Sequence, residues 1–117
     1  MQIHYALLRF VTECNILDIA FALDIAQAQT DWTGVKNFIK QFITQYLRVA
    51  PDAVRVSVVT YDSRSATVQF NLTKYSDESQ VKYAIDQIPF VSSGTADVTY
   101  ALRSLAQDVF KVRKLNN

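Results

Sequence analysis

The sequence contains little glycine and proline and a single cysteine. Glycine occurs at Gly34 and Gly94, and proline at Pro51 and Pro89. Nucleotide-binding loops need several closely spaced glycines so that backbone amides can approach phosphate, and low-complexity linkers are rich in both residue types. The chain therefore contains neither kind of segment. A single cysteine also means that no disulfide can form within these 117 residues.

An excess of one charge and a long apolar run are lacking as well. The chain carries 12 basic and 11 acidic residues, a formal net charge of +1, and its lysines and arginines are scattered. Nucleic-acid-binding proteins usually show a basic excess or stripe, so we expect no nucleic-acid partner. No run approaches the ~18 apolar residues of a membrane-spanning helix, so we expect no membrane span.

Residues suited to catalysis are scarce. The only histidine, His4, lies in an N-terminal stretch that we interpret as irregular, and Cys14 precedes the first expected strand. The acids Asp18, Asp24 and Asp62 form no catalytic motif. A hydrolase needs a nucleophile beside a positioned base, and a zinc site needs spaced histidines or cysteines. We therefore predict that the protein is not an enzyme.

What the sequence does contain is a series of strand and helix patterns. The nearly continuous apolar run Leu17–Asp24 predicts a central parallel strand, and the β-branched cluster in Ala53–Tyr61 predicts a second. Polar and apolar residues alternate over 67–72, which predicts a strand with one wet face. We interpret Val56–Leu72 as a hairpin whose second strand lies at the sheet edge.

Helix patterns separate and follow these strands. Apolar residues recur at helical spacing over 35–47, 81–88 and 98–110, and Pro89 ends the second of these helices. The order strand–helix–strand–strand–helix–helix predicts an α/β fold, a Rossmann-like, doubly wound, mainly parallel sheet with one antiparallel edge hairpin strand and flanking helices. No strand pattern follows the last helix, so we expect the fold to be incomplete at its C-terminus.

Four segments follow one another along the chain: Leu17–Asp24, Val35–Ile39, Pro51–Tyr61 and Ser93–Leu102. In this order they resemble the von Willebrand factor type A (VWA) domain family, and the likeness runs from about Cys14 to Phe110. The style is that of the A domains of collagens, matrilins and related extracellular matrix proteins. We accordingly divide the chain into an N-terminal extension at residues 1–14, interpreted as a degenerate leader, and a partial VWA domain at residues 15–117.

The resemblance also directs attention to a metal site. Many family members bind a divalent ion at a metal-ion-dependent adhesion site (MIDAS). Its ligands come from an Asp-x-Ser-x-Ser motif, a threonine from a second loop and a later aspartate. Here Asp24 matches the first aspartate and Thr95 the threonine, but Ala26 and Ala28 stand at the serine positions. The later aspartate would follow a strand that we do not find. Because Mg²⁺ needs a shell of oxygen ligands, we expect a degenerate site, no tight Mg²⁺ binding, no other cofactor, and structural roles for Asp24 and Thr95.

Two residues are candidates for covalent modification. Asn71-Leu72-Thr73 matches the N-glycosylation pattern, which also arises often by chance. Cys14 is either a buried or inert thiol or half of a disulfide whose partner lies outside this chain. In matrix A domains a cysteine just before the first strand often pairs with one after the domain, so the resemblance favours the disulfide.

The resemblance implies a secreted, non-enzymatic module of the extracellular matrix. Such a module mediates adhesion by binding protein partners, with collagen or another matrix protein as the candidate ligand, and here without metal. Two alternatives stay open, an intracellular VWA scaffold subunit of a multi-protein complex and a truncated product without independent activity. Truncation would leave a central strand edge open, which would promote association through the incomplete sheet.

Overall fold

The computed structural model describes residues 5–11, 17–26, 31–91 and 94–110. Its centre is a four-stranded sheet in the order β1-β2-β3-β4. The strands are β1 (Tyr5–Val11), β2 (Leu17–Asp24), β3 (Val54–Tyr61) and β4 (Ala66–Phe70). β2 and β3 are parallel, whereas β1 is antiparallel to β2 and β4 is antiparallel to β3. The fold is α/β with a mixed sheet, so the expectation of a mainly parallel sheet is wrong.

Strand β1 is responsible for this correction. The stretch that we interpreted as an irregular N-terminal extension contains a strand that pairs with the whole of β2 except its last residue, from Tyr5 opposite Leu23 to Val11 opposite Leu17. The pairing is antiparallel because only residues 12–16 connect the two strands, and a parallel crossover needs a dozen residues or more. β1 also covers one edge of β2, so that β2 has a neighbouring strand on both sides.

The predicted central strands β2 and β3 are confirmed. Seven of the eight residues of β2 and six of the eight of β3 are buried, as expected of parallel strands covered on both faces. Their register places Phe21 beside Val58, and Asp24 beside Tyr61. The carboxyl ends of both strands therefore lie at the same edge of the sheet.

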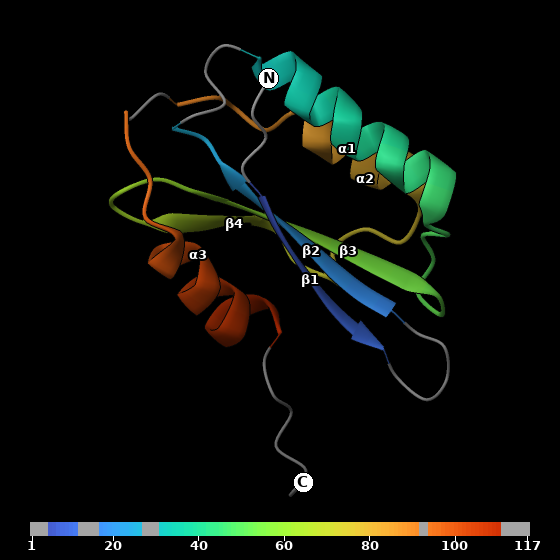
Figure 1. Ribbon diagram of the computed structural model, residues 1–117. Coiled ribbons are helices and arrows are strands. Elements are labelled where there is room, and N and C mark those ends of the chain that lie inside the picture. The colour runs from blue at the N-terminus through green and yellow to red at the C-terminus, as the bar shows by residue number, and fades with distance from the viewer. Residues whose placement is uncertain (1–4, 12–16, 27–30, 92–93, 111–117) are drawn as a thin grey trace, which may run out of the picture.

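Helices cover both faces of this sheet, as predicted (Figure 1). Helices α1 (Trp32–Tyr46) and α2 (Glu78–Asp86) lie side by side on one face. Helix α3 (Val98–Ser104), continued by a π-helical turn at Leu105–Val109, lies on the other face. Each face has its own apolar core, and the larger one lies under α1 and α2.

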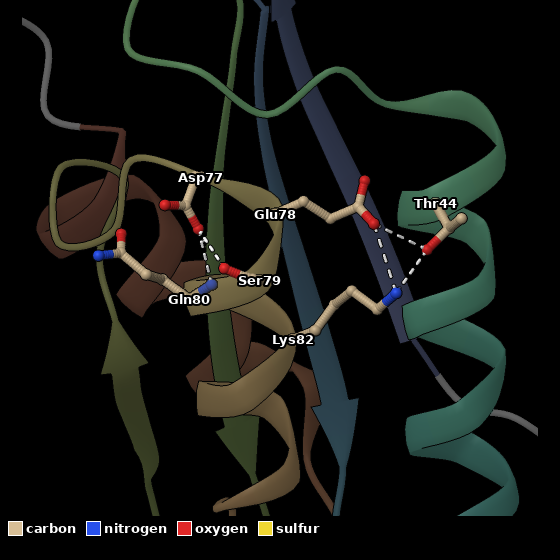
Figure 2. A network of polar contacts seen from close by, with 6 residues as sticks. All are labelled: Thr44, Asp77, Glu78, Ser79, Gln80 and Lys82. Atoms are coloured by element: carbon tan, nitrogen blue, oxygen red, sulfur yellow. Dashed lines mark hydrogen bonds and ion pairs between the residues drawn. The ribbon is translucent and has the colours of Figure 1, made fainter.

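Each helix begins at an aspartate that caps it. Asp31, Asp77 and Asp97 accept hydrogen bonds from the backbone N–H groups of Gly34, Gln80 and Thr99, respectively. Figure 2 shows the cap of α2, in which Asp77 also accepts the Ser79 hydroxyl at 2.8 Å. A capping carboxylate satisfies amides that have no partner within the helix and lies at the positive end of the helix dipole. These caps fix where each preceding loop ends and its helix begins.

Polar side chains join α1 to α2 at their exposed side (Figure 2). Lys82 Nζ lies 2.7 Å from Thr44 Oγ1 and 3.3 Å from Glu78 Oε2, and the Thr44 hydroxyl donates to Glu78 at 3.1 Å. Lys40 pairs with Asp86 at 2.7 Å. Exposed ion pairs of this kind contribute only ~0.2–1 kcal/mol each, so the apolar core holds the two helices in place.

The buried face of α3 differs from the predicted stripe. Its buried residues, with those of the π-helical turn, are Ala101, Ser104, Leu105 and Val109. Val98 and Leu102, both expected in the stripe, are each 47% exposed. The face is thus rotated toward Ser104, whose hydroxyl is bonded to Asp108 at 3.2 Å. A pattern of apolar residues does not detect this rotation, because the buried Ser104 is a polar residue and does not count toward such a pattern.

Candidate functional site

The candidate site is the edge of the sheet at the carboxyl ends of β2 and β3, called the rim below. Three segments meet there, residues 24–26, 61–65 and 94–97. The Ile25 N–H donates to the Tyr61 carbonyl at 3.1 Å, and the Asp97 N–H donates to the Asp62 carbonyl at 3.2 Å. In Figure 1 the loop that leads into α3 passes this end of the sheet. Open α/β sheets bind ligands at the carboxyl ends of their strands, so this edge is the first place to look for function.

Asp24 ends β2 at the rim and is only 5% exposed. Its Oδ1 accepts the backbone N–H of Ala26 at 2.9 Å, so the carboxylate folds back onto its own turn. Beside it, burial and the negative charge of Asp24 raise the pKa of Tyr61. The Tyr61 phenol therefore stays protonated at neutral pH. The Asp24 carboxylate thus stabilises the turn after β2.

The other predicted metal-site residues are distributed as follows. Ala26 is buried directly after β2, and Ala28 lies outside the described residues. Thr95 is exposed in the loop before α3 and follows Gly94, whose φ of 84° is a backbone conformation that favours glycine. The bond between Asp97 and Asp62 anchors this loop at the rim. The structure thus places the segments of Asp24 and Thr95 at one edge.

Asp62 is a rim residue whose role was not predicted from the sequence. Its carboxylate accepts the backbone N–H groups of Arg64 at 2.7 Å and Ser65 at 3.1 Å, and the Arg64 guanidinium lies 3.2 Å away. These three donors hold the pKa of Asp62 below its ordinary value, and the Arg64 backbone N–H has the largest effect. The available signal was an aspartate at the first position of a serine-containing turn, where a side-chain oxygen binds following amides.

The carboxylates in the described part of the rim are bonded to backbone amides. No group of three or more His, Cys, Asp or Glu side chains suited to a metal occurs among the described residues. The carboxylates of Asp24 and Asp62 bind backbone amides, and Ala26 presents a methyl group. Mg²⁺ requires near-octahedral oxygen coordination and keeps its water where protein ligands are few. Ala26 and Ala28 supply no such oxygen here.

Asn71 lies away from this edge. Cys14 lies outside the described residues. Asn71 is exposed and follows β4 in a turn closed by the Lys74 N–H and the Asn71 carbonyl at 3.2 Å. The next residues of this turn line a hollow with Arg55, which lies at the beginning of β3. Asn71 is therefore at the opposite end of the sheet from the rim.

None of the helices in the described ranges is both long and apolar enough to cross a membrane.

Comparison with known proteins gives matrilins and a collagen chain among the relatives. Human matrilin-3 is 31% identical over 104 residues, which cover 87% of this chain and 21% of matrilin-3. The human collagen alpha-5(VI) chain is 32% identical over 80 residues, which cover 67% of this chain and 3% of the collagen chain. The chain thus spans about a fifth or less of these relatives.

Solved structures agree with these sequence relatives. Proximal thread matrix protein 1 from the mussel byssus superposes with a TM-score of 0.73 at 30% identity, over 80% of this chain and 25% of that protein. A form of it described as having a zinc-occupied MIDAS motif gives a TM-score of 0.75 at 27% identity, over 92% of this chain and 28% of that one. The family model for the von Willebrand factor type A domain matches residues 18–116, which is most of the chain, and the chain therefore belongs to the VWA domain family.

Proposed function

We propose that the protein is a non-enzymatic module of the extracellular matrix that binds protein partners at its rim without a metal ion. Membership of the VWA family and the names of its relatives support this proposal, since they are matrilins, a collagen chain and a thread matrix protein. Collagen and other matrix proteins are the proposed partners, and a secreted location follows from them. An intracellular scaffold role gains no support from relatives of this kind.

The alanines at positions 26 and 28 are the observation that carries metal independence. They stand where the family motif has serine hydroxyls, and a methyl group cannot coordinate an ion. Asp24 still has carboxylate oxygens to offer, and one of them, Oδ1, also accepts the Ala26 N–H. An ion at this place would have to be held largely by water, which gives weak binding.

Catalysis has no part in the proposal. Asp24, Asp62 and Asp97 all accept backbone N–H groups of their own turns or helix cap. A general base needs an oxygen or nitrogen that reaches the proton of a substrate, and a nucleophile needs a base beside it. The three aspartates instead fix the shape of the rim, which supports a surface for recognition.

A solid-phase binding assay tests this function. Matrilin-3 and type VI collagen preparations are immobilised, and the 117-residue chain is added in buffer with Mg²⁺ or with EDTA. We expect saturable binding to at least one preparation, with the same Kd in both buffers. Binding that is lost in EDTA would contradict metal independence. Absence of binding to both preparations would contradict the adhesion role.

Two matched variants test whether the rim is the binding surface. Arg64→Ala removes an exposed arginine at the rim, and Arg48→Ala removes one after α1, at the opposite end of the sheet. The Arg48 carbonyl accepts the N–H of Val54 at the beginning of β3, which places it far from the rim. We expect Arg64→Ala to weaken binding several-fold and Arg48→Ala to leave it unchanged. The reverse pattern would move the surface away from the rim.

A further inference from the structure

We propose that Asn71 carries an N-linked glycan and that this glycan shields the open edge of β4. The inference rests on the proposed extracellular function, because the oligosaccharide is attached in the secretory pathway. Asn71-Leu72-Thr73 is the one Asn-x-Ser/Thr triplet in the chain, and its middle residue is not proline. The pattern alone is weak, and the conformation of the triplet is what strengthens it.

The side chains of Asn71 and Thr73 meet in a turn. The Asn71 Oδ1 accepts the Thr73 N–H at 3.3 Å and the Thr73 hydroxyl at 3.2 Å. Both residues are exposed, whereas Leu72 between them is buried in the smaller core. The buried leucine therefore anchors the turn, and the amide and hydroxyl groups, the two groups that define the acceptor, lie on its solvent side.

This arrangement is local enough to form before the rest of the fold. Its hydrogen bonds join residues two apart, and such local side-chain-to-backbone bonds need no partner from a distant part of the chain. In the proposed step, the Asn71 amide nitrogen forms a bond to the anomeric carbon of a lipid-pyrophosphate-linked oligosaccharide. The bond from that carbon to the pyrophosphate oxygen breaks, the lipid pyrophosphate leaves, and the amide nitrogen loses one proton.

The folded protein has room for the product. A hollow of about 140 Å³ lies beside the turn, lined by Pro51, Arg55, Leu72, Thr73, Tyr75 and Ser76. No buried side chain has to move, because Asn71 is already exposed. The turn is at the opposite end of the sheet from the rim, so a glycan here leaves the proposed partner surface uncovered.

The position of Asn71 suggests what the glycan does. In the part of the chain that the structure describes, β4 is an edge strand of five residues, and Asn71 follows its last residue, Phe70. An open strand edge presents backbone groups that pair with other chains, and proteins protect such edges with charges, bulges or covering groups. A hollow of about 170 Å³ that includes Gln69, Phe70 and Tyr83 lies along the same edge. A bulky, hydrated oligosaccharide one residue beyond β4 would keep a second strand from docking there.

The acceptor is tested by expressing the full chain behind a secretion leader in mammalian cells. We expect a species of lower electrophoretic mobility, which peptide N-glycosidase F converts to the unmodified mobility while leaving aspartate at position 71. Asn71→Asp keeps an oxygen that accepts the Thr73 bonds but removes the amide, so the fold stays and the shift disappears. Thr73→Ala abolishes the shift, and Thr73→Ser retains it.

A matched control shows that the expressed chain is accessible to the oligosaccharyltransferase, the enzyme that attaches the glycan. Asp77→Asn, in the Asn71→Asp background, creates an Asn-x-Ser triplet that ends at Ser79, at an exposed helix cap that asparagine also fills (Figure 2). An unmodified Asn71 in cells where this control is glycosylated would overturn the proposal. Because the leader supplies entry, this result does not depend on where the protein naturally resides. The matrix-binding assay can therefore fail while the Asn71 result holds.

The shielding role has its own measurement. Size-exclusion chromatography compares the glycosylated chain with the enzymatically deglycosylated chain over rising concentration. We expect the deglycosylated chain to associate at a several-fold lower concentration, and Thr67→Lys, a charge at the exposed position of β4, to reverse this association. Equal association with and without the glycan would overturn the shielding role.

Discussion

Asp18 and Arg55 lie beside each other on the parallel strands β2 and β3 and form a two-point ion pair. Arg55 Nε is 2.7 Å from Asp18 Oδ1, and the second guanidinium nitrogen is 2.6 Å from Oδ2. The hydrogen bond to Asp18, above all, raises the pKa of Arg55, so the guanidinium is charged at any accessible pH. A slip of β3 by one residue would separate these two charges, and the pair therefore helps to fix the register of the sheet.

Removing one partner of this pair should destabilise the fold. We expect Arg55→Met to lower the free energy of unfolding by roughly 2–4 kcal/mol, somewhat less than for a fully buried pair because Arg55 keeps some contact with water. Asp18→Leu combined with Arg55→Met should recover most of the loss, since no unpaired charge remains. Urea unfolding of the three proteins measures both effects. An Arg55→Met chain as stable as the unaltered one would contradict this role.

The rim should lose stability in acid through Asp62. Its pKa is lowered in the folded state by the Arg64 N–H and the other donors, so its contribution is fully present above the unfolded pKa of about 4 and is lost as pH falls through the folded pKa. We expect Asp62→Asn to be less stable than the unaltered chain at neutral pH, with the difference shrinking below about pH 4. Urea midpoints across pH measure this. A difference that does not change with pH would mean that the charge of Asp62 has no role.

Two leucines of the last helical segment provide a matched test of its packing. Leu105 is fully buried against the sheet, whereas Leu102 is half exposed. We expect Leu105→Ala to cost about 2–5 kcal/mol and Leu102→Ala less than about 1 kcal/mol. Thermal or urea unfolding distinguishes them because the substitution is the same. Equal costs would show that the segment turns a different face to the sheet.

Much of this fold follows from local patterns in the sequence. Leu17–Asp24 and Val54–Tyr61 are apolar enough to require cover on both faces, and that requirement alone places them at the centre of the sheet. The regular stripe of α1 likewise predicts its buried residues Val35, Ile39 and Ile43. These features depend on nearby residues, so a single sequence is sufficient to predict them.

The features that were missed depend on partners distant in space. Tyr5–Val11 is apolar but not alternating, and only its pairing with β2 distinguishes a strand from a leader. The rotation of α3 depends on how Ser104 fits against the sheet. At the rim, the sequence indicates which residues replace the serines, but not that Asp24 binds the Ala26 amide or that Asp62 organises the adjoining turn. Hydrogen-bond geometry of this kind leaves no periodic signal.

The proposal that the rim recognises its partner without metal is tested most directly by isothermal titration of the chain with Mn²⁺ and Mg²⁺. Asp24→Asn is the matched control, because it keeps an oxygen for the Ala26 amide and removes the charge that an ion would need. We expect no binding tighter than millimolar in either protein. A micromolar site in the unaltered chain that Asp24→Asn abolishes would contradict the account.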